Sequence, residues 1–164
     1  MKNAIVTGAT KGIGLAVARK LLEEGYFVVV TYAHDELSAE ACREELRRIS
    51  PNFEVVRADQ SDKHAMREFA SKMLQKGHID CIVCNAGTTL RRELKDITDE
   101  DWERTMQVNL NSSLYLIRDL YDAIPHNSRI IFIGSLPPLP PGTPPPSWTA
   151  LSAACSPLYR NLFL

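Results

Sequence analysis

The chain has 164 residues, of which 45% are hydrophobic and 24% are charged, and this size and composition predict one globular domain with a hydrophobic core. Nineteen Lys and Arg balance twenty Asp and Glu to a net charge of −1, with no basic block, which argues against a nucleic-acid partner or an anionic membrane surface. No apolar run approaches the ~20 residues of a membrane span, and the first residues lack the pattern of a secretory signal. We therefore expect a cytoplasmic protein whose partners are small molecules.

Strand and helix patterns alternate along the first 135 residues. In chain order they predict strand Asn3–Thr7, helix Ile13–Glu24, strand Tyr26–Tyr32, helix Asp35–Ile49, strand Phe53–Arg57, helix Asp62–Lys76, strand Ile79–Cys84, a long helix from Thr98–Asp101 to about Ala123, and strand Arg129–Ile133. Strands that are apolar throughout, separated by amphipathic helices, indicate a parallel sheet buried on both faces. The predicted fold class is α/β, a doubly wound parallel sheet or Rossmann fold.

The four cysteines are scattered unevenly, at Cys42, Cys81, Cys84 and Cys155, which is typical of a reduced, cytosolic chain. Cys81 and Cys84 have C-x-x-C spacing, but residues i and i+3 of a strand point to opposite faces. We expect buried structural thiols and no metal site, because a second ligand pair for zinc is missing.

A glycine-rich turn joins the first predicted strand to the first predicted helix, with the sequence Thr-Gly-Ala-Thr-Lys-Gly-Ile-Gly from Thr7 to Gly14. Glycine permits a tight turn and lets the backbone approach a phosphate group at a helix N-terminus. This T-G-x-x-x-G-x-G spacing differs from the common G-x-G-x-x-G dinucleotide fingerprint. The candidate cofactor-binding residues of this turn are Gly8, Thr10, Lys11, Gly12, Ile13 and Gly14.

Four further polar motifs follow at the ends of later elements. They are Asp59-Gln60 after the third strand, Asn85-Ala86-Gly87 at the end of the fourth, Val108-Asn109-Leu110 within the long helix, and Gly134-Ser135 after the fifth strand. Taken singly, Asp59 could be an ordinary surface carboxylate and Asn109 a solvent-facing amide. An asparagine inside a helix is unfavourable by propensity, which favours a tertiary or functional use.

In this order, the five motifs resemble the short-chain dehydrogenase/reductase family, most closely the bacterial 3-oxoacyl-acyl-carrier-protein reductases. The resemblance implies that Asp59 accepts a hydrogen bond from the adenine amino group and that Asn85-Ala86-Gly87 lines the nicotinamide-ribose side of the pocket. It implies that Asn109 bends its helix and positions a water of the proton relay, and that Ser135 binds the substrate carbonyl. Ser112 stands where the family has a small glycine.

The resemblance also implies an oxidoreductase that reduces a ketone to a secondary alcohol, on a small-molecule or carrier-bound carbonyl substrate. Family members assemble as homodimers or homotetramers through the long helix and the helix that follows it.

The end of the second strand bears on the choice of cofactor. An acid there would accept a bond from the ribose 2′-hydroxyl and repel a 2′-phosphate. The strand ends Thr31-Tyr32-Ala33-His34, with no acid before Asp35, and Lys11 stands in the turn where NADP-preferring relatives carry a basic residue. We expect NADP, with NAD as the alternative cofactor and with Tyr32 at the site. Alternatively, Lys11 is a solvated surface lysine.

The family pattern breaks after Ser135. Seven of the next eleven residues are proline, which prevents a strand or packed helix at 136–147. The sequence therefore divides into a core, 1–135, and a Pro-rich tail, 136–164. This tail is either a polyproline linker or the product of a truncation or reading-frame error, and the sheet is expected to be incomplete at its C-terminal edge.

The catalytic Tyr and Lys of the family are absent from the tail. Trp148 and Ser152 stand at the expected positions, the only later tyrosine is Tyr159, and no lysine follows Lys95. An indole has no acidic hydroxyl to donate. The sequence thus predicts an impaired reductase or, alternatively, a catalytically inactive nucleotide-binding or regulatory module.

Overall fold

The computed structural model describes residues 1–90 and 93–134 of the chain, and its centre is a five-stranded parallel sheet of order β3-β2-β1-β4-β5. The strands are β1 (Asn3–Val6), β2 (Phe27–Tyr32), β3 (Phe53–Arg57), β4 (Cys81–Cys84) and β5 (Arg129–Phe132). All four strand pairs are parallel. The predicted doubly wound α/β fold is confirmed.

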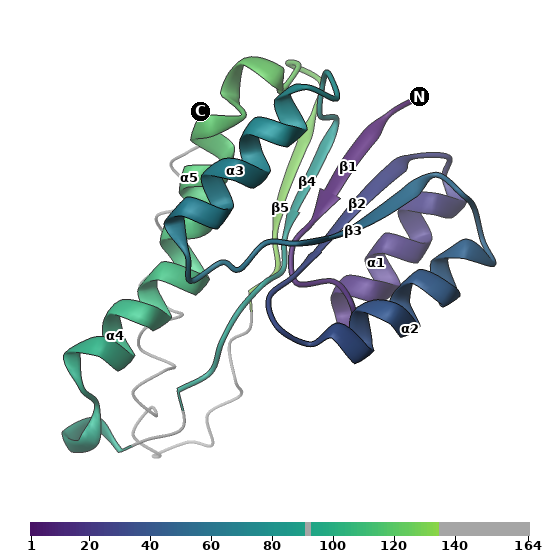
Figure 1. The fold of residues 1–164 in the computed structure, drawn as a ribbon. Helices are drawn as coiled ribbons and strands as arrows, with labels where there is room; N and C mark the ends of the chain where they lie inside the picture. Colours follow the sequence, from purple (N-terminus) through teal and green to yellow (C-terminus); the bar gives the residue numbers. More distant parts are fainter. Residues whose placement is uncertain (91–92, 135–164) are drawn as a thin grey trace, which may run out of the picture.

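Helices cover both faces of the sheet (Figure 1), as the continuous apolar strands require. On one face lie α1 (Gly12–Glu23) and α2 (Glu36–Arg47), and on the other α3 (Lys63–Leu74) and α5 (Ser112–Asp119). Alternate residues of β1, β2 and β4 enter the two hydrophobic clusters. On β4, Cys81 packs in the α1–α2 cluster and Cys84 in the α3–α5 cluster, so the two thiols point to opposite faces, as predicted.

The segment between β4 and β5 corrects the prediction of one long helix. It consists of a short turn η1 (Leu94–Asp96), helix α4 (Asp99–Met106), a π-helical turn η2 (Gln107–Asn111), helix α5, and a 3₁₀ turn η3 (Tyr121–Ala123). The predicted start is confirmed by a capping box, in which Thr98 and Asp101 bond each other's backbone amides. The apolar spacing does not reveal the π turn, because a π turn contains only one residue more than a turn of α-helix.

The buried face of α2 also differs from the prediction. The spacing of Leu37, Ala41, Leu46 and Ile49 predicts that these four residues form the apolar side, yet Leu37 is 88% exposed and Ala41 is exposed as well. The buried residues are Ala39, Cys42 and Leu46, which also have helical spacing. Leu46 belongs to both sets, and Ile49, just beyond the end of α2, packs partly buried against the same cluster.

Most other element ends lie one or two residues from their predicted positions. Thr7, Tyr26 and Ile133 fall just outside the strands, and β4 begins at Cys81 rather than Ile79. The Ile79 amide donates to Ala123 O instead of to a neighbouring strand. At the sheet edge, Ile131 of β5 is 45% exposed. Within the described ranges, no helix combines the length and apolar character needed to cross a membrane.

Candidate functional site

The carboxyl ends of β1 and β4 form the centre of the candidate site. From β1 the chain winds outward through β2 to β3, and it then crosses back to β4 on the other side of β1. The loops after β1 and β4 therefore leave the sheet in opposite directions, and in open α/β sheets ligands bind in the crevice that this reversal creates. Figure 1 shows the two strands side by side, between the two layers of helices.

Thr7 and Asn85 join the two loops across this crevice. The Thr7 hydroxyl accepts hydrogen bonds from the amides of Asn85 and Ala86, both at 3.1 Å. In return, Asn85 Nδ2 donates to Thr7 O at 3.0 Å and to Gly8 O at 2.9 Å. The glycine-rich turn and the Asn85-Ala86-Gly87 motif thus form one hydrogen-bonded unit. Thr7 was not among the predicted site residues, because its role depends on a contact across 78 residues.

Two glycines are required by the closeness of these loops. A Cβ on Gly8 would lie 2.8 Å from Ala86 Cα, and Gly8 has a φ of 60°. A Cβ on Gly14 would lie 2.5 Å from Asn85 Nδ2. No other residue fits either position without moving a backbone or the Asn85 amide.

The N-terminus of α1 lacks the side-chain cap that the three following helices possess. Asp35, Asp62 and Thr98 cap α2, α3 and α4 through their side chains, whereas Lys11 at the start of α1 makes no such bond. The first turn of α1 has no acidic residue. Gly12, with a φ of 59°, has open space where a Cβ would lie. Unpaired amides and the helix dipole make this turn suitable for an anionic phosphate group.

The remaining turn residues lie around that N-terminus. Thr10 is buried, whereas Ile13 is 64% exposed in the first turn of α1. Lys11 extends toward the start of α2, where its Nζ lies 2.8 Å from Asp35 Oδ2. The predicted residues of the glycine-rich turn therefore lie together around the N-terminus of α1. The basic side chain among them, Lys11, is already paired with Asp35.

A hollow of about 370 Å³ lies at the ends of β1 to β4. Seven predicted cofactor-binding residues line it, namely Gly8, Tyr32, Asp59, Gln60, Asn85, Ala86 and Gly87. His34, Ser61, Thr88, Arg104 and Val108 also line it; the sequence motifs did not identify these residues as site residues. The strand ends bring together motifs that are far apart in the sequence.

Asp59 is held in a fixed orientation within this hollow. Its Oδ1 accepts bonds from the Ser61 amide and hydroxyl, each at 2.8 Å, and its Oδ2 lies 2.8 Å from His34 Nε2. Burial opposes ionisation of Asp59, but the Ser61 bonds and His34 outweigh it and keep the pKa of the carboxyl below its usual value. Asp59 is therefore a charged acceptor at neutral pH.

The Tyr32 hydroxyl is already engaged outside the hollow. It donates to Glu36 Oε2 at 2.6 Å, and the guanidinium of Arg43 lies 5.8 Å from the centre of its ring. Its side chain is 7% exposed. Tyr32 thus lines the hollow and also anchors β2 to α2.

Gln60, which lines the hollow, and Gln107 form a buried polar pair. Gln107 Nε2 donates to Gln60 O at 3.2 Å, while both polar side-chain atoms of Gln60 and the oxygen of Gln107 are buried without a hydrogen-bond partner. The two side chains are 5% and 7% exposed. Because the Gln60 amide is enclosed, a ligand in the hollow would contact its main chain. Buried amides without partners are costly, and no sequence pattern predicts this pair.

Asn109 lies in the π turn and connects it to the loop after β4. Its Oδ1 accepts from the Thr88 amide at 2.7 Å, and its Nδ2 donates to Thr88 O at 3.0 Å. Ser112 is fully buried one residue after the π turn, and its hydroxyl donates to Val108 O at 2.9 Å. The position that the family gives to glycine therefore tolerates serine, since the hydroxyl finds a partner within its own helix.

Ser135 and the tail residues Trp148, Ser152 and Tyr159 lie outside the described residues. The structure therefore shows the predicted cofactor residues and Asn109, but not the predicted substrate-binding serine. Within residues 1–90 and 93–134, no group of three or more His, Cys, Asp or Glu side chains is placed to hold a metal ion.

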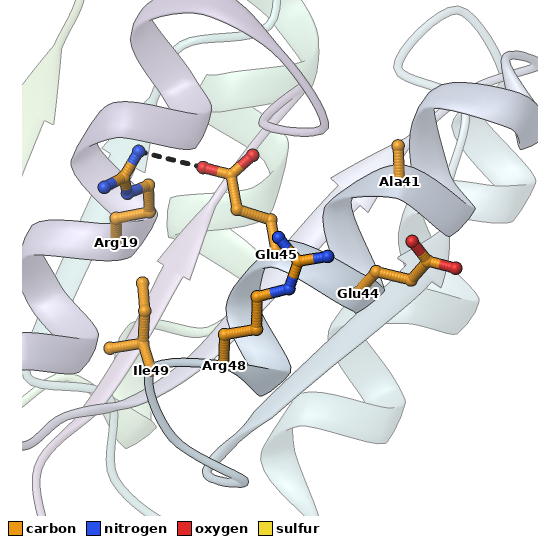
Figure 2. Close-up of a pocket in the computed structure, with 6 residues that line it drawn as sticks. All are labelled: Arg19, Ala41, Glu44, Glu45, Arg48 and Ile49. Atoms are coloured by element: carbon orange, nitrogen blue, oxygen red, sulfur yellow. Dashed lines mark hydrogen bonds and ion pairs between the residues drawn. The ribbon is translucent and has the colours of Figure 1, made fainter.

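A second hollow, of about 560 Å³, lies between α1 and α2. Figure 2 shows its lining residues, which carry both signs of charge, and the Arg19–Glu45 ion pair at 2.9 Å: Arg19, Ala41, Glu44, Glu45, Arg48 and Ile49. Although it is larger, it lies between the outer helices, and no motif of the sequence contributes to it. We assign it no role.

The fold and the site match one known family. The family profile described as "short chain dehydrogenase" matches residues 2–159 of this chain. Versicolorin reductase 1 of Aspergillus parasiticus is 34% identical over 135 residues, which cover 82% of this chain and 52% of the relative. The short-chain dehydrogenase/reductase FrzI of Cladobotryum is 35% identical over 136 residues, covering 82% and 53%. The chain spans about half the length of these relatives.

Solved structures agree with this match. A dehydrogenase/reductase from Sinorhizobium meliloti superposes with a TM-score of 0.85 at 32% identity, covering 98% of this chain and 66% of that one. A short-chain dehydrogenase from Burkholderia cenocepacia, solved in complex with NADP, has a TM-score of 0.83 at 27% identity, covering 96% and 64%. With the sheet order, the glycine-rich turn and the profile match in agreement, the chain belongs to the short-chain dehydrogenase/reductase family.

Proposed function

We propose that this chain provides the cofactor-binding part of an NADP(H)-dependent oxidoreductase that reduces a ketone to a secondary alcohol. The proposed substrate is a small-molecule or carrier-bound carbonyl compound, as in the 3-oxoacyl-acyl-carrier-protein reductases that the motifs resemble. Two related structures, from Burkholderia cenocepacia and from a metagenomic source, are complexes with NADP, which supports this choice over NAD.

The observation that carries the proposal is the uncapped N-terminus of α1, set in the crevice between β1 and β4. The amides of Gly12, Ile13 and Gly14 would hold the pyrophosphate there. Gly8 and Gly14 let the glycine-rich turn pack closely against the loop after β4, because a Cβ at either position would strike Ala86 or Asn85. The residues present thus fit a dinucleotide.

The other predicted residues take positions along the same ligand. Asp59, charged and fixed by Ser61, would accept a bond from the adenine amino group, next to the main chain of Gln60. Asn85-Ala86-Gly87 would line the nicotinamide ribose. Asn109 holds the same loop after β4 through its two bonds to Thr88. When bound, the nicotinamide supplies the hydride. Ser135 is proposed to hold the substrate carbonyl.

A second candidate is a nucleotide-binding or regulatory module without turnover. It is favoured by one observation, the lack of any Tyr-x-x-x-Lys segment after Ser135, where the only tyrosine is Tyr159. Reduction of a ketone leaves an oxyanion that needs a proton donor, and no such donor is available at the expected position. We therefore propose that the 164-residue chain binds NADPH but reduces ketones poorly.

The family resemblance also leads us to propose an oligomeric state for this protein. Trp102 of α4, Leu114 of α5 and Tyr121 of η3 are exposed by 46%, 37% and 75%, and they provide apolar area on the segment through which the family assembles. We propose a homodimer or homotetramer that is weakened if the next helix of the family is missing.

Two glycine variants test the cofactor site. Gly12 and Gly77 both have positive φ and open space at the Cβ position, so alanine strains the backbone at either position, but only Gly12 lies at the proposed phosphate site. NADPH fluorescence should show saturable binding to the wild-type chain and to Gly77→Ala, and at least tenfold weaker binding to Gly12→Ala. Equal binding by all three proteins would refute the proposed site.

A turnover assay separates the two candidate functions. NADPH consumption by the wild-type chain with a 3-oxoacyl thioester should not exceed that of Gly12→Ala. Substrate-dependent consumption by the wild type would show that the chain is an active reductase and that its proton donor was not recognised.

A further inference from the structure

A single peptide group, between Gln60 and Ser61, connects Gln107 of the π turn to the Asp59 carboxylate in the hollow at the strand ends. Its carbonyl oxygen, Gln60 O, accepts a hydrogen bond from Gln107 Nε2 at 3.2 Å. Its amide, Ser61 N, donates to Asp59 Oδ1 at 2.8 Å. The peptide group is trans and planar, so its C=O and N–H point in opposite directions, and a bond that fixes one also fixes the other. Gln107 therefore orients the amide that holds Asp59.

This chain of two hydrogen bonds is largely shielded from water. The bond from Gln107 to Gln60 O is buried, and the Asp59 side chain, which lines the hollow, is only 20% exposed. Hydrogen bonds that are sheltered from water are electrostatically stronger, and bonds in a chain polarise one another. The bond from Gln107 thus makes the Ser61 amide a stronger donor to Asp59.

Stability alone does not account for the two buried glutamines. Both polar side-chain atoms of Gln60 and the oxygen of Gln107 have no hydrogen-bond partner among the described residues, and buried polar atoms without partners lower stability. An apolar side chain of similar length would fill the position of Gln107 without this cost. A buried polar group that lowers stability calls for another explanation, and the peptide group that Gln107 contacts leads directly to Asp59.

We propose that Gln107 is a positioning residue for base recognition, which acts through the Gln60–Ser61 peptide group to hold the Asp59 carboxylate against the amino group of the ligand's base. The inference rests on the proposed dinucleotide function, in which Asp59 accepts a bond from adenine. A charged acceptor at this place disfavours a base that carries a carbonyl oxygen instead of the amino group, because two acceptors repel each other. Gln107 thus favours adenine over hypoxanthine, although it is not among the residues that line the hollow.

The expected size of the effect follows from the other contacts of Asp59. Its Oδ1 also accepts from the Ser61 hydroxyl at 2.8 Å, and its Oδ2 lies 2.8 Å from His34 Nε2. These contacts remain when Gln107 is replaced, so the preference for adenine should weaken without disappearing. A partial loss of one hydrogen bond to a charged group corresponds to a change of about three- to tenfold in relative affinity.

The test compares NADPH with its hypoxanthine analogue, in which oxygen replaces the amino group of the base, with Kd measured by nicotinamide fluorescence. Gln107→Met keeps the length of the side chain and removes the donor, and Gln107→Leu is a second variant. The wild-type chain should bind NADPH more tightly than the analogue. The ratio of the two affinities should fall about three- to tenfold in both variants.

A second measurement needs no ligand. Burial of Asp59 raises its pKa, but the Ser61 bonds and the charges of His34 and Arg104 outweigh burial and lower it. If Gln107 strengthens the Ser61 amide as a donor, the pKa of Asp59 should be higher in Gln107→Met than in the wild type. Carbon-13 NMR of the side-chain carboxyl group during a pH titration measures this.

Thr105→Val is the matched control, because it removes another side-chain hydrogen bond of the same segment, from Thr105 Oγ1 to Asp101 O at 2.7 Å, which stays within α4. Its affinity ratio and the pKa of its Asp59 should equal those of the wild type. Asp59→Asn should lower the ratio, and the addition of Gln107→Met should then lower it no further, because Gln107 acts through the carboxylate.

The possible outcomes separate this inference from the proposed function. If the wild type binds both ligands, an unchanged ratio in the two Gln107 variants or in Asp59→Asn would overturn this inference alone. A fall caused by Gln107→Met that is equally large with and without Asp59→Asn would do the same. Failure of the wild type to bind either ligand would overturn the proposed function, and this inference with it.

Discussion

At the scale of single residues, Thr7 contributes most to the geometry of the site. Its hydroxyl accepts bonds from two backbone amides of the loop after β4, at Asn85 and Ala86, and donates toward Val83 O at 3.5 Å. Thr7 is 1% exposed, so water has little access to its hydroxyl. The side chain therefore holds the two halves of the crevice at a fixed separation.

Thr7→Val should leave both amides without an acceptor while keeping the side-chain shape. A fully buried amide that loses its partner costs about 1–3 kcal/mol. Because these two bonds are partly buried, we expect the free energy of unfolding to fall by about 1–3 kcal/mol in total. Urea unfolding measures it. Thr31→Val is the control, because Thr31 Oγ1 accepts from Gly8 N alone, at 3.2 Å. This variant should lower the free energy of unfolding by less than Thr7→Val does. Equal losses in the two variants would contradict the role given to Thr7.

At the scale of elements, the π turn η2 controls the loop after β4. A π turn interrupts regular hydrogen bonding in a helix and is often found at functional sites. Here it presents the Asn109 amide to both backbone groups of Thr88. The π turn thus lies where the family resemblance implies a bend of the helix, and both the bend and the proton-relay role of Asn109 stay predictions.

Asn109→Ala should release this loop. We expect hydrogen exchange at the Thr88 amide to accelerate by about ten- to a hundredfold, in line with a lost bond worth roughly 1–3 kcal/mol. Asn109→Asp keeps the acceptor for the Thr88 amide but sets a carboxylate oxygen against Thr88 O, where Asn109 Nδ2 donates, so it should protect the Thr88 amide only in part. Unchanged exchange in Asn109→Ala would show that the loop is held by other contacts.

The order of the elements could be predicted from sequence, but several of their contacts could not. Apolar runs and glycine-rich turns depend on neighbouring residues, so the strands and three of the helices lay close to their predicted positions. The Thr7–Asn85 bonds, the Lys11–Asp35 pair and the buried Gln60–Gln107 pair join distant segments, and no local pattern encodes them. The π turn was not predicted, because the apolar residues of α4 and α5 have the spacing of one continuous helix.

At the scale of the whole molecule, the two hydrophobic clusters hold the sheet from both faces, and each contains thiols. Cys42 lies in the α1–α2 cluster and Cys84 in the α3–α5 cluster. Burial raises the pKa of each thiol to about 11. The fold therefore favours the protonated thiols, which are inert at neutral pH.

The raised pKa of Cys84 predicts a loss of stability in alkali. A group whose pKa is higher in the folded state stabilises the fold below its unfolded pKa, here the ordinary 9.0, and this stabilisation is lost as the pH rises toward about 11. Cys84→Ala should cost stability at pH 8, but its difference from the wild type should shrink by about 1–2 kcal/mol near pH 10. Urea unfolding at both pH values measures this. A difference that is independent of pH would contradict the burial argument.

The central claim is that the crevice between β1 and β4 binds a dinucleotide at the N-terminus of α1. The most direct measurement is the change in backbone amide chemical shifts when NADPH is added to the 164-residue chain. The account predicts that the largest changes fall on Gly12, Ile13 and Gly14, with further changes at Asp59–Gln60 and Asn85–Gly87. Changes confined to the residues between α1 and α2 that Figure 2 shows, or no changes at all, would contradict it.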